Sequence, residues 1–305
     1  MTLYQKTAPP FGFDCPTCET KSSMSEYVYG FLHLQRCKQC ELVFDRRVPT
    51  ATELKDHYTT YSYNYLKKCP DPTLRSFNRL LLNFERFRLN GRILDIGCGQ
   101  GDFLTEATKR KWQSYGTEYS TSAIQLSEKR GITIISEPAN YEDFNGLTFD
   151  VITCFEVIEH IQSQCILFDL VYKLLRPGGL FYVTTPNFNS LLRFFEKKNF
   201  KMISYPEHLC FYTKYSLKYL AVTHGFTVNV VTTTGIDVSR LKTQLWRISG
   251  RKTKRPQDMI VQSENDGLRD RIDSNKILLL TKAAANLLLG WTGTGDTLKG
   301  WFLKP

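Results

Sequence analysis

A run of apolar residues that ends in a glycine-rich turn constrains this chain more than any other feature. Arg92–Ile96 has the composition of a buried strand, and Gly97, Gly99 and Gly101 follow it directly. Glycine lets the backbone approach a ligand closely, because it has no side chain and tolerates positive φ. Residue 102 is aspartate, so the Gly-x-Gly-x-x-Gly spacing of dinucleotide-binding folds is absent. The turn therefore predicts a nucleotide-like ligand that lacks a pyrophosphate.

From this turn onward, short apolar segments alternate with amphipathic ones. The apolar segments are typical of strands, which we expect at 92–96, 114–118, 132–135, 149–155, 180–185 and 226–233. Helices are expected between them, and the helix at 164–175 should end at Arg176-Pro177-Gly178-Gly179. Alternating strands and helices predict an α/β fold, a Rossmann-like parallel sheet with helices on both faces.

Four of the nine cysteines form two close pairs near the start of the chain. Two residues separate Cys15 from Cys18 and Cys37 from Cys40, and the pairs lie 18 residues apart. This spacing is typical of four thiolates around one structural zinc ion. A redox Cys-x-x-Cys pair is the competing interpretation, and two pairs at this distance favour zinc. A closed four-cysteine site has no open coordination position, so we expect no catalytic role for it.

Three further motifs follow the glycine-rich turn in order. Glu118 ends the second expected strand, Phe149–His160 runs from the fourth strand into a loop, and Leu174–Gly179 precedes the fifth. Together with the turn, these motifs resemble those of class I S-adenosylmethionine-dependent methyltransferases over residues 75–235. The resemblance implies methyl transfer from S-adenosylmethionine. It also implies a last strand, here 297–303, that pairs with the sheet in the reversed direction.

The resemblance assigns the cofactor to particular residues. These are Asp95, Gly97, Gly99, Gly101, Glu118, Phe155 and Glu156. Asp95 would lie near the amino group of the cofactor, and the glycines beneath its methionine and ribose portions. Glu118 would bind the ribose hydroxyls, and Phe155 and Glu156 would line the methionine side. The adenine-contacting residue is not assigned, because residues 137–141 depart from the family pattern.

Two histidines follow expected strand ends, where acceptors bind in sheets of this kind. His160 follows the fourth strand, and His208 lies in Tyr205–Thr213, after the fifth. The second segment resembles the Pro-Glu-His-Leu-x-Phe-x-Thr loop of bacterial methyltransferases that act on sugars and other small molecules. We expect His208 or His160 to take the acceptor's proton, with Glu207 orienting the imidazole. Structural histidines that bond a neighbouring loop are the alternative.

Composition and motifs divide the chain into four segments. We expect a zinc-binding module at 1–48, and a linker with an N-terminal helical lid at 49–90. The catalytic domain that binds S-adenosylmethionine follows at 91–235, and a helical basic insertion with the last strand at 236–305. The lid is expected from a tyrosine run and a helical pattern; a packed linker is the alternative. The tyrosines are Tyr58, Tyr61, Tyr63 and Tyr65.

The charge of the chain points to an anionic partner. The formal net charge is +10, and residues 236–305 hold 13 Lys/Arg against 7 Asp/Glu. Five of those cations lie within 247–255. Such a cluster attracts anions, although a solvated loop would show the same composition. We expect an anionic small-molecule acceptor, with nucleic acid as the less favoured partner.

These features favour an enzyme that methylates a sugar or nucleotide-linked sugar in polysaccharide or natural-product biosynthesis. An RNA methyltransferase with a zinc ribbon and a non-catalytic adaptor that binds the cofactor are the alternatives. The chain contains no apolar run long enough for a membrane span, and its first residues lack the apolar region of a signal peptide. We therefore expect a cytoplasmic protein.

Overall fold

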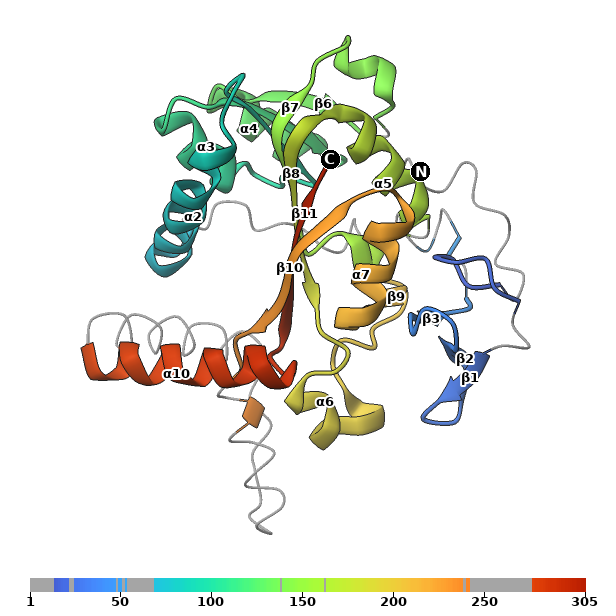
Figure 1. Ribbon diagram of the computed structural model, residues 1–305. Coiled ribbons are helices and arrows are strands. Elements are labelled where there is room, and N and C mark those ends of the chain that lie inside the picture. The colour runs from blue at the N-terminus through green and yellow to red at the C-terminus, as the bar shows by residue number, and fades with distance from the viewer. Residues whose placement is uncertain are drawn as a thin grey trace.

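The computed structural model describes residues 14–21, 25–47, 49–50, 53, 69–137, 139–161, 163–237, 240–241 and 276–305. Within these residues the strands form one sheet of seven strands and one of four. The large sheet runs through the centre of the molecule with helices on both sides, and most of the small sheet lies at one edge (Figure 1). The predicted α/β fold class is confirmed.

The seven-stranded sheet has the predicted parallel core and reversed last strand. Its members are β4 (Arg92–Ile96), β5 (Gln113–Glu118), β6 (Thr133–Ser136), β7 (Phe149–Phe155), β8 (Leu175–Pro186), β10 (Thr227–Thr234) and β11 (Thr297–Leu303). They lie in the order β10-β11-β8-β7-β4-β5-β6. The strands from β4 to β8 pair in parallel, whereas β11 inserts antiparallel between β8 and β10. The bounds of β4, β7 and β11 are those expected from the sequence.

The sequence predicts that the fifth strand begins at Leu180, which is wrong by five residues. β8 begins at Leu175, which pairs with Phe149, and the register shifts before Val151 pairs with Leu180. Glycine makes this irregularity possible, because a Cβ at Gly179 would lie 2.9 Å from the carbonyl oxygen of Arg176. The Pro-Gly-Gly segment therefore bends the strand without ending its pairing.

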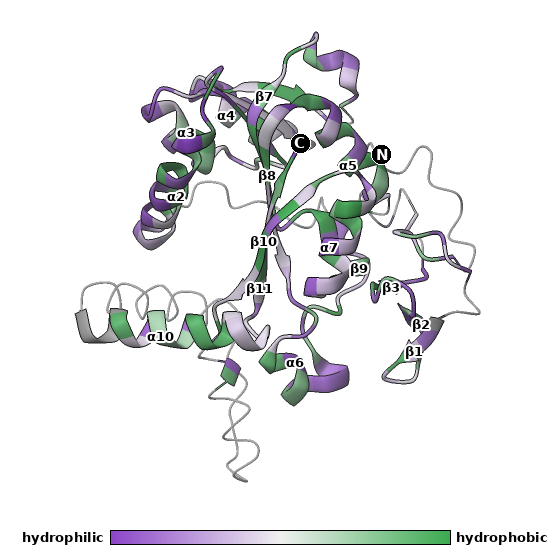
Figure 2. Cartoon of the chain, in the orientation of Figure 1, coloured by the Kyte–Doolittle hydropathy of each residue, from purple (hydrophilic) through white to green (hydrophobic). Residues whose placement is uncertain are grey.

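Helices cover both faces of the large sheet. They are α2 (Asp71–Phe84), α3 (Asp102–Lys109), α4 (Thr121–Lys129), α5 (Gln164–Leu174), α6 (Leu191–Glu196), α7 (Lys214–Thr223) and α10 (Lys276–Thr292), with short 3-10 helices η2 (Glu85–Phe87), η3 (Tyr141–Phe144), η4 (Ile158–His160) and η5 (Lys197–Asn199). Successive strand residues point to opposite faces. Val151 packs in the core with residues of α2 and α3, and Ile152 in the core with residues of α5 and α7. β7, whose side chains fill both cores, is mostly hydrophobic (Figure 2).

The small sheet joins the cysteine-bearing segment to the large domain. Its strands are β1 (Ser25–Val28), β2 (Phe31–Cys37), β3 (Val43–Asp45) and β9 (Cys210–Phe211), in that order. β9 comes from the loop after β8, so Phe44 pairs with Cys210 and Val43 with Phe211, residues far apart in the chain. Leu42 and Phe44 also pack in the core that contains α5 and α7 residues. The described strands of the first proposed segment, 1–48, therefore pair and pack with the third, 91–235.

Two parts of the sequence-based prediction lie outside the described residues. They are the tyrosine run at 58–65 and the basic cluster at 247–255. Among the residues that are described, no helix is long and apolar enough to cross a membrane. The predicted helix within 49–90 is present as α2, which buries Leu81 and Phe84.

A buried carboxylate holds β7 to its neighbours. Asp150 is fully buried and accepts hydrogen bonds from the backbone amides of Leu89, Asn90 and Gly91 and from Nε of Arg176 at 2.6 Å. Burial by itself would raise the pKa of Asp150, but these hydrogen bonds outweigh it and lower the pKa below its usual value. The ionised carboxylate therefore stabilises the fold at neutral pH.

We expect Asp150→Asn to lower the free energy of unfolding by about 3 kcal/mol, because Arg176 would lose its buried partner. Because the pKa of Asp150 is lowered in the native state, the stabilisation by its ionised carboxylate is present at neutral pH and fades as the pH falls below about 4. Urea denaturation of both proteins measures the difference. Glu128→Gln, on the exposed face of α4, is the control and should change stability by less than about 0.5 kcal/mol. Equal stability of Asp150→Asn and wild type would contradict this account.

Candidate active site

The turn after β4 is left-handed at all three glycines. The φ angles are +66° at Gly97, +54° at Gly99 and +76° at Gly101. A Cβ on Gly97 would lie 2.7 Å from a methyl carbon of Val157, and one on Gly101 would lie 2.5 Å from Ile132. A Cβ on Gly99 would meet nothing within 4 Å. Packing therefore excludes side chains at Gly97 and Gly101, while Gly99 exposes its backbone to open space.

Glu118, at the end of β5, fixes the shape of this turn. Its Oε2 accepts a hydrogen bond from the amide of Gly99 at 2.9 Å. Its Oε1 accepts from the amides of Tyr119 at 2.9 Å and Ser120 at 2.8 Å. The residue is 7% exposed. Three donated hydrogen bonds orient the carboxylate beside the glycine-rich turn.

A cleft of about 600 Å³ opens beside the turn at the carboxyl ends of the parallel strands. Five of the predicted cofactor residues line it, namely Asp95, Gly97, Gly99, Phe155 and Glu156. The other two, Gly101 and Glu118, support the turn. Thr73 and Phe77 of α2 and Thr184 of β8 also line the cleft and were not predicted as site residues. The helical pattern that contains Phe77 is the sequence signal that indicated α2, the helix that contributes Thr73 and Phe77 to the lining of the cleft.

Aromatic rings form one wall of the cleft. The centroid of the Phe103 ring lies 5.0 Å from that of Phe155 and 5.4 Å from that of Phe77, in edge contacts. These residues come from three different elements, α3, β7 and α2. The wall therefore offers an apolar surface opposite the polar backbone of the turn.

Two carboxyl groups near the turn have raised pKa values. Thr153 Oγ1 donates to Oδ1 of Asp95 at 2.7 Å, and Thr117 Oγ1 donates to Oε1 of Glu137 at 2.9 Å. Burial raises the pKa of each to about 7, and the charge of Glu118 adds to both shifts. Clustered carboxylates of this kind favour a cationic ligand, which would draw them toward the ionised form.

Glu156 turns the chain out of β7. It has a left-handed φ of +52°, an unfavourable conformation for a residue with a side chain. Its amide donates to the carbonyl oxygen of Thr184 at 3.0 Å, which holds this conformation. The turn leads into η4 and so places Glu159 and His160 immediately beyond a residue that lines the cleft.

The two predicted histidines lie side by side. The ring centroids of His160 and His208 are 4.8 Å apart in an edge contact. Nδ1 of His160 is 2.6 Å from the carbonyl oxygen of Glu207, and Nδ1 of His208 is 2.8 Å from that of Met202. A carbonyl oxygen only accepts, so in the neutral rings Nδ1 carries the proton and Nε2 keeps a lone pair. Burial, followed by the charge of His208, lowers the pKa of His160 to about 4.

A third side chain completes this group. Glu159 is 2% exposed, and its Oε2 accepts from Thr185 Oγ1 at 2.9 Å. Its Oε1 lies 3.9 Å from Nε2 of His160. Burial and the charge of Glu156 raise the pKa of Glu159. Sequence reasoning missed this residue, although it stands next to His160 in the chain.

Glu207 contacts the histidine pair through its backbone. Its carbonyl oxygen orients His160, while its carboxylate accepts from Ser204 Oγ at 2.9 Å. The carbonyl of Met202 orients His208. His160 and His208 are not among the residues that line the cleft described above, although the charge of Glu156, which does line it, acts on Glu159.

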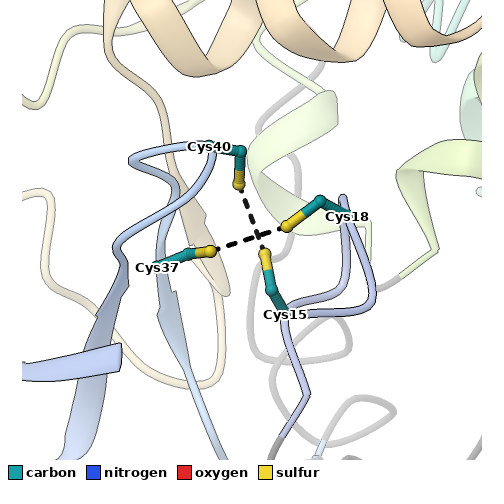
Figure 3. Close-up of side chains that lie close together, drawn as sticks. All are labelled: Cys15, Cys18, Cys37 and Cys40. Carbon is teal, nitrogen blue, oxygen red and sulfur yellow. Dashed lines mark hydrogen bonds between the residues drawn. The ribbon is translucent and has the colours of Figure 1, made fainter. Parts of the chain in front are cut away.

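The four predicted cysteines converge on one point (Figure 3). The sulfurs of Cys15 and Cys40 are 3.4 Å apart, and those of Cys18 and Cys37 are 3.5 Å apart. All four are free thiols, and all four sulfurs lie within 4.8 Å of one another. Contact with Cys40 and burial raise the pKa of Cys15, and burial raises that of Cys37 to about 11.

The reversed last strand, the glycine-rich turn after β4 and the acidic residue at the end of β5 define a class I S-adenosylmethionine-dependent methyltransferase. Comparison with protein families agrees with this class. The model of the methyltransferase domain family matches residues 66–243, and the chain belongs to that family.

Relatives and solved structures are consistent with this assignment. The ubiquinone biosynthesis O-methyltransferase of Vibrio cholerae is 28% identical over 127 residues, 38% of this chain and 52% of that protein. The Marinobacter nauticus protein of the same name is 31% identical over 137 residues, covering 39% and 57%. The chain thus spans about half the length of these relatives. A methyltransferase structure from Archaeoglobus fulgidus has a TM-score of 0.51 at 17% identity, covering 82% of this chain and 100% of that one, and supports the fold.

The raised pKa of Asp95 predicts how cofactor binding depends on pH. S-adenosylmethionine is cationic near its sulfur and amino group, so it should prefer the ionised carboxylate. With a pKa of about 7 in the free enzyme, protonation at lower pH competes with binding. We expect affinity to fall about tenfold between pH 8 and pH 6, measured by calorimetry. Asp95→Asn should bind the cofactor weakly and with little pH dependence, whereas Glu137→Gln should keep the pH dependence of the wild type. An unchanged pH profile in Asp95→Asn would refute this role.

Proposed function

We propose that this enzyme transfers the methyl group to a hydroxyl oxygen of a small molecule, a sugar or nucleotide-linked sugar. The observation that carries the proposal is the His160–His208 pair. Both rings have an unprotonated Nε2 in their neutral form, and His160 follows Glu156, a residue that lines the cleft, by four positions in the chain. A hydroxyl acceptor needs a group that removes its proton, and an imidazole serves this purpose near neutral pH.

The cleft has the properties that S-adenosylmethionine requires. The open space at Gly99 leaves the backbone accessible, and the carboxylates of Asp95 and Glu156 complement the positive charges of the cofactor. Asp95 would bind its amino group, Glu118 its ribose, and Phe155 and Glu156 its methionine side. Gly97 and Gly101 would keep the turn in shape beneath it. When bound, the cofactor supplies an electrophilic methyl group.

The residues of the chain then align the acceptor and handle its proton. The aromatic wall around Phe155 excludes water from the reacting atoms, which favours transfer over side reactions. Nε2 of His208 accepts the hydroxyl proton, with His160 shaping the pocket. Lys299 of β11 pairs with Thr184 of the cleft, and its interaction with Glu156 partly offsets the charge of that carboxylate.

An intermediate of ubiquinone biosynthesis is the second candidate acceptor. The names of the curated relatives favour it, and both candidates are methylated on oxygen. The two candidates differ in the acceptor and not in the use of the cofactor cleft or of the histidine pair.

We propose a structural zinc ion at the four cysteines. A zinc–sulfur distance of about 2.3 Å in a tetrahedron separates the sulfurs by about 3.8 Å, close to the 3.4 and 3.5 Å between Cys15 and Cys40 and between Cys18 and Cys37. A disulfide would need about 2.0 Å. A dication would also offset the repulsion among four thiolates, and it would favour the ionised forms of Cys15 and Cys37, whose pKa values are raised without it.

Incubation with methyl-labelled S-adenosylmethionine tests the proposed acceptor. We expect label to enter nucleotide sugars, and His208→Ala to lower the rate about 100-fold or more, because the proton would lose its acceptor. His224→Ala, a histidine that pairs with Asp169, is the control and should keep the rate. Label that enters ubiquinone precursors would establish the second candidate. Label that enters only total RNA would refute small-molecule methylation, and label that enters nothing would favour an adaptor.

Metal analysis tests the zinc proposal. The purified protein should hold about one zinc ion per chain, and Cys37→Ser should lose it and unfold at lower temperature. Cys165→Ser is a matched control, because the Cys165 sulfur lies 3.5 Å from the carbonyl oxygen of Pro16, beside the cluster but outside it. A folded wild-type protein without zinc after purification from zinc-containing medium would contradict the proposal.

A further inference from the structure

The group formed by Glu159, His160 and His208 has an arrangement that acid–base chemistry alone does not require. Each residue offers one ligand atom, and these atoms lie within 4.8 Å of one another. Both histidines donate Nδ1–H to backbone carbonyls, so both Nε2 lone pairs remain. A carboxylate oxygen of Glu159 lies 3.9 Å from Nε2 of His160. Three ligand atoms therefore lie close to one another, and both neutral imidazoles carry their proton on Nδ1 and not on the Nε2 that would bind an ion.

We propose that Glu159, His160 and His208 bind a divalent metal ion, in the segments that follow β7 and β8 and separate from the four-cysteine cluster. Histidines that ligate a metal through Nε2 commonly donate Nδ1–H to a backbone carbonyl, which fixes the ring and the tautomer. Both histidines show this contact. Metal–ligand bonds of about 2.1 Å allow ligand atoms up to about 4.2 Å apart. The three ligand atoms therefore need to move only slightly closer together to bind one ion.

The supporting hydrogen bonds hold the three ligands in place. Thr185 Oγ1 donates to Oε2 of Glu159, which leaves Oε1 on the side of His160. The amide of Leu209 donates to the carbonyl oxygen of Glu159 at 2.8 Å, and the amide of His208 donates to that of Ser204 at 2.7 Å. The two ligand-bearing segments, 49 positions apart, are thus joined through their backbones. A preorganised group of this kind loses little entropy when it binds an ion.

Two imidazoles and one carboxylate favour first-row divalent ions such as Mn²⁺, Fe²⁺ or Co²⁺ and leave coordination positions open. Those positions would take the hydroxyl oxygen of the acceptor and lower its pKa. With the ion bound, the proton would therefore leave to solvent, and His208 would act as a ligand in place of its role as a base. An acceptor with two adjacent hydroxyls would bind best, because both oxygens could coordinate. This assignment of the acceptor rests on the proposed function, whereas the binding of the metal does not.

Manganese binding to the full chain tests the proposal, because Mn²⁺ prefers oxygen and imidazole ligands over the thiolates of the cysteine cluster. After mild chelation that leaves zinc in place, titration followed by the electron paramagnetic resonance of free Mn²⁺ should show one site per chain. Glu159→Gln, which keeps the shape of the side chain, and His208→Ala should each weaken binding about 10–100-fold. His224→Ala should bind as wild type does. Thermal unfolding shows whether each variant is folded.

Absence of Mn²⁺ binding by the folded wild type, or equal binding by Glu159→Gln and wild type, would overturn the metal site. Methyl transfer with and without added Mn²⁺ separates this proposal from the proposed function. Transfer that is fast without metal and unaffected by Glu159→Gln would leave His208 as a base and refute the role of the ion. Metal binding with no transfer to any hydroxyl acceptor would retain the site and refute the proposed acceptor.

Discussion

The site depends on the parallel pairing of β4 with β5 on one side and β7 on the other. Asp95 lies opposite Gly116 and Thr153 in these two ladders, so all three strands end at the same edge of the sheet. That alignment brings the glycine-rich turn, Glu118 and Glu156 together although they are far apart in the chain. The buried hydrogen bond from Thr153 to Asp95 and the amides donated to Glu118 then fix the polar groups at this edge. The cleft is a consequence of strand register.

A second pairing, between β3 and β9, couples the cysteine cluster to the histidine loop. Val43 pairs with Phe211, and the amide of Asp45 donates to the carbonyl oxygen of Leu209 at 2.8 Å. Leu209 follows His208 directly, and its own amide donates to Glu159. A structural ion at the cysteines would therefore stabilise the segment that holds the proposed acceptor group. This connection gives the N-terminal segment a physical role in the active site.

Local sequence predicts the parts of the structure that local forces decide. The apolar run 149–155 and the segment 297–303 have the strand bounds observed, since each is a short buried or half-buried strand between polar turns. The cofactor turn was also predictable, because positive φ and close packing require glycine there. The meeting of Glu159 with His208 was not, since it depends on a loop that returns after 49 residues. The same holds for β9, whose two residues carry no strand signal of their own.

The central claim is that the cofactor lies along the glycine-rich turn with its reacting end toward the histidine group. A crystal structure of the enzyme with S-adenosylhomocysteine, the product of methyl transfer, tests it most directly. We expect the ribose hydroxyls at Glu118, the amino group near Asp95, and the sulfur on the side of Glu156 that leads to His160 and His208. A ligand bound outside this cleft, or one with its sulfur facing away from the histidine group, would contradict the account.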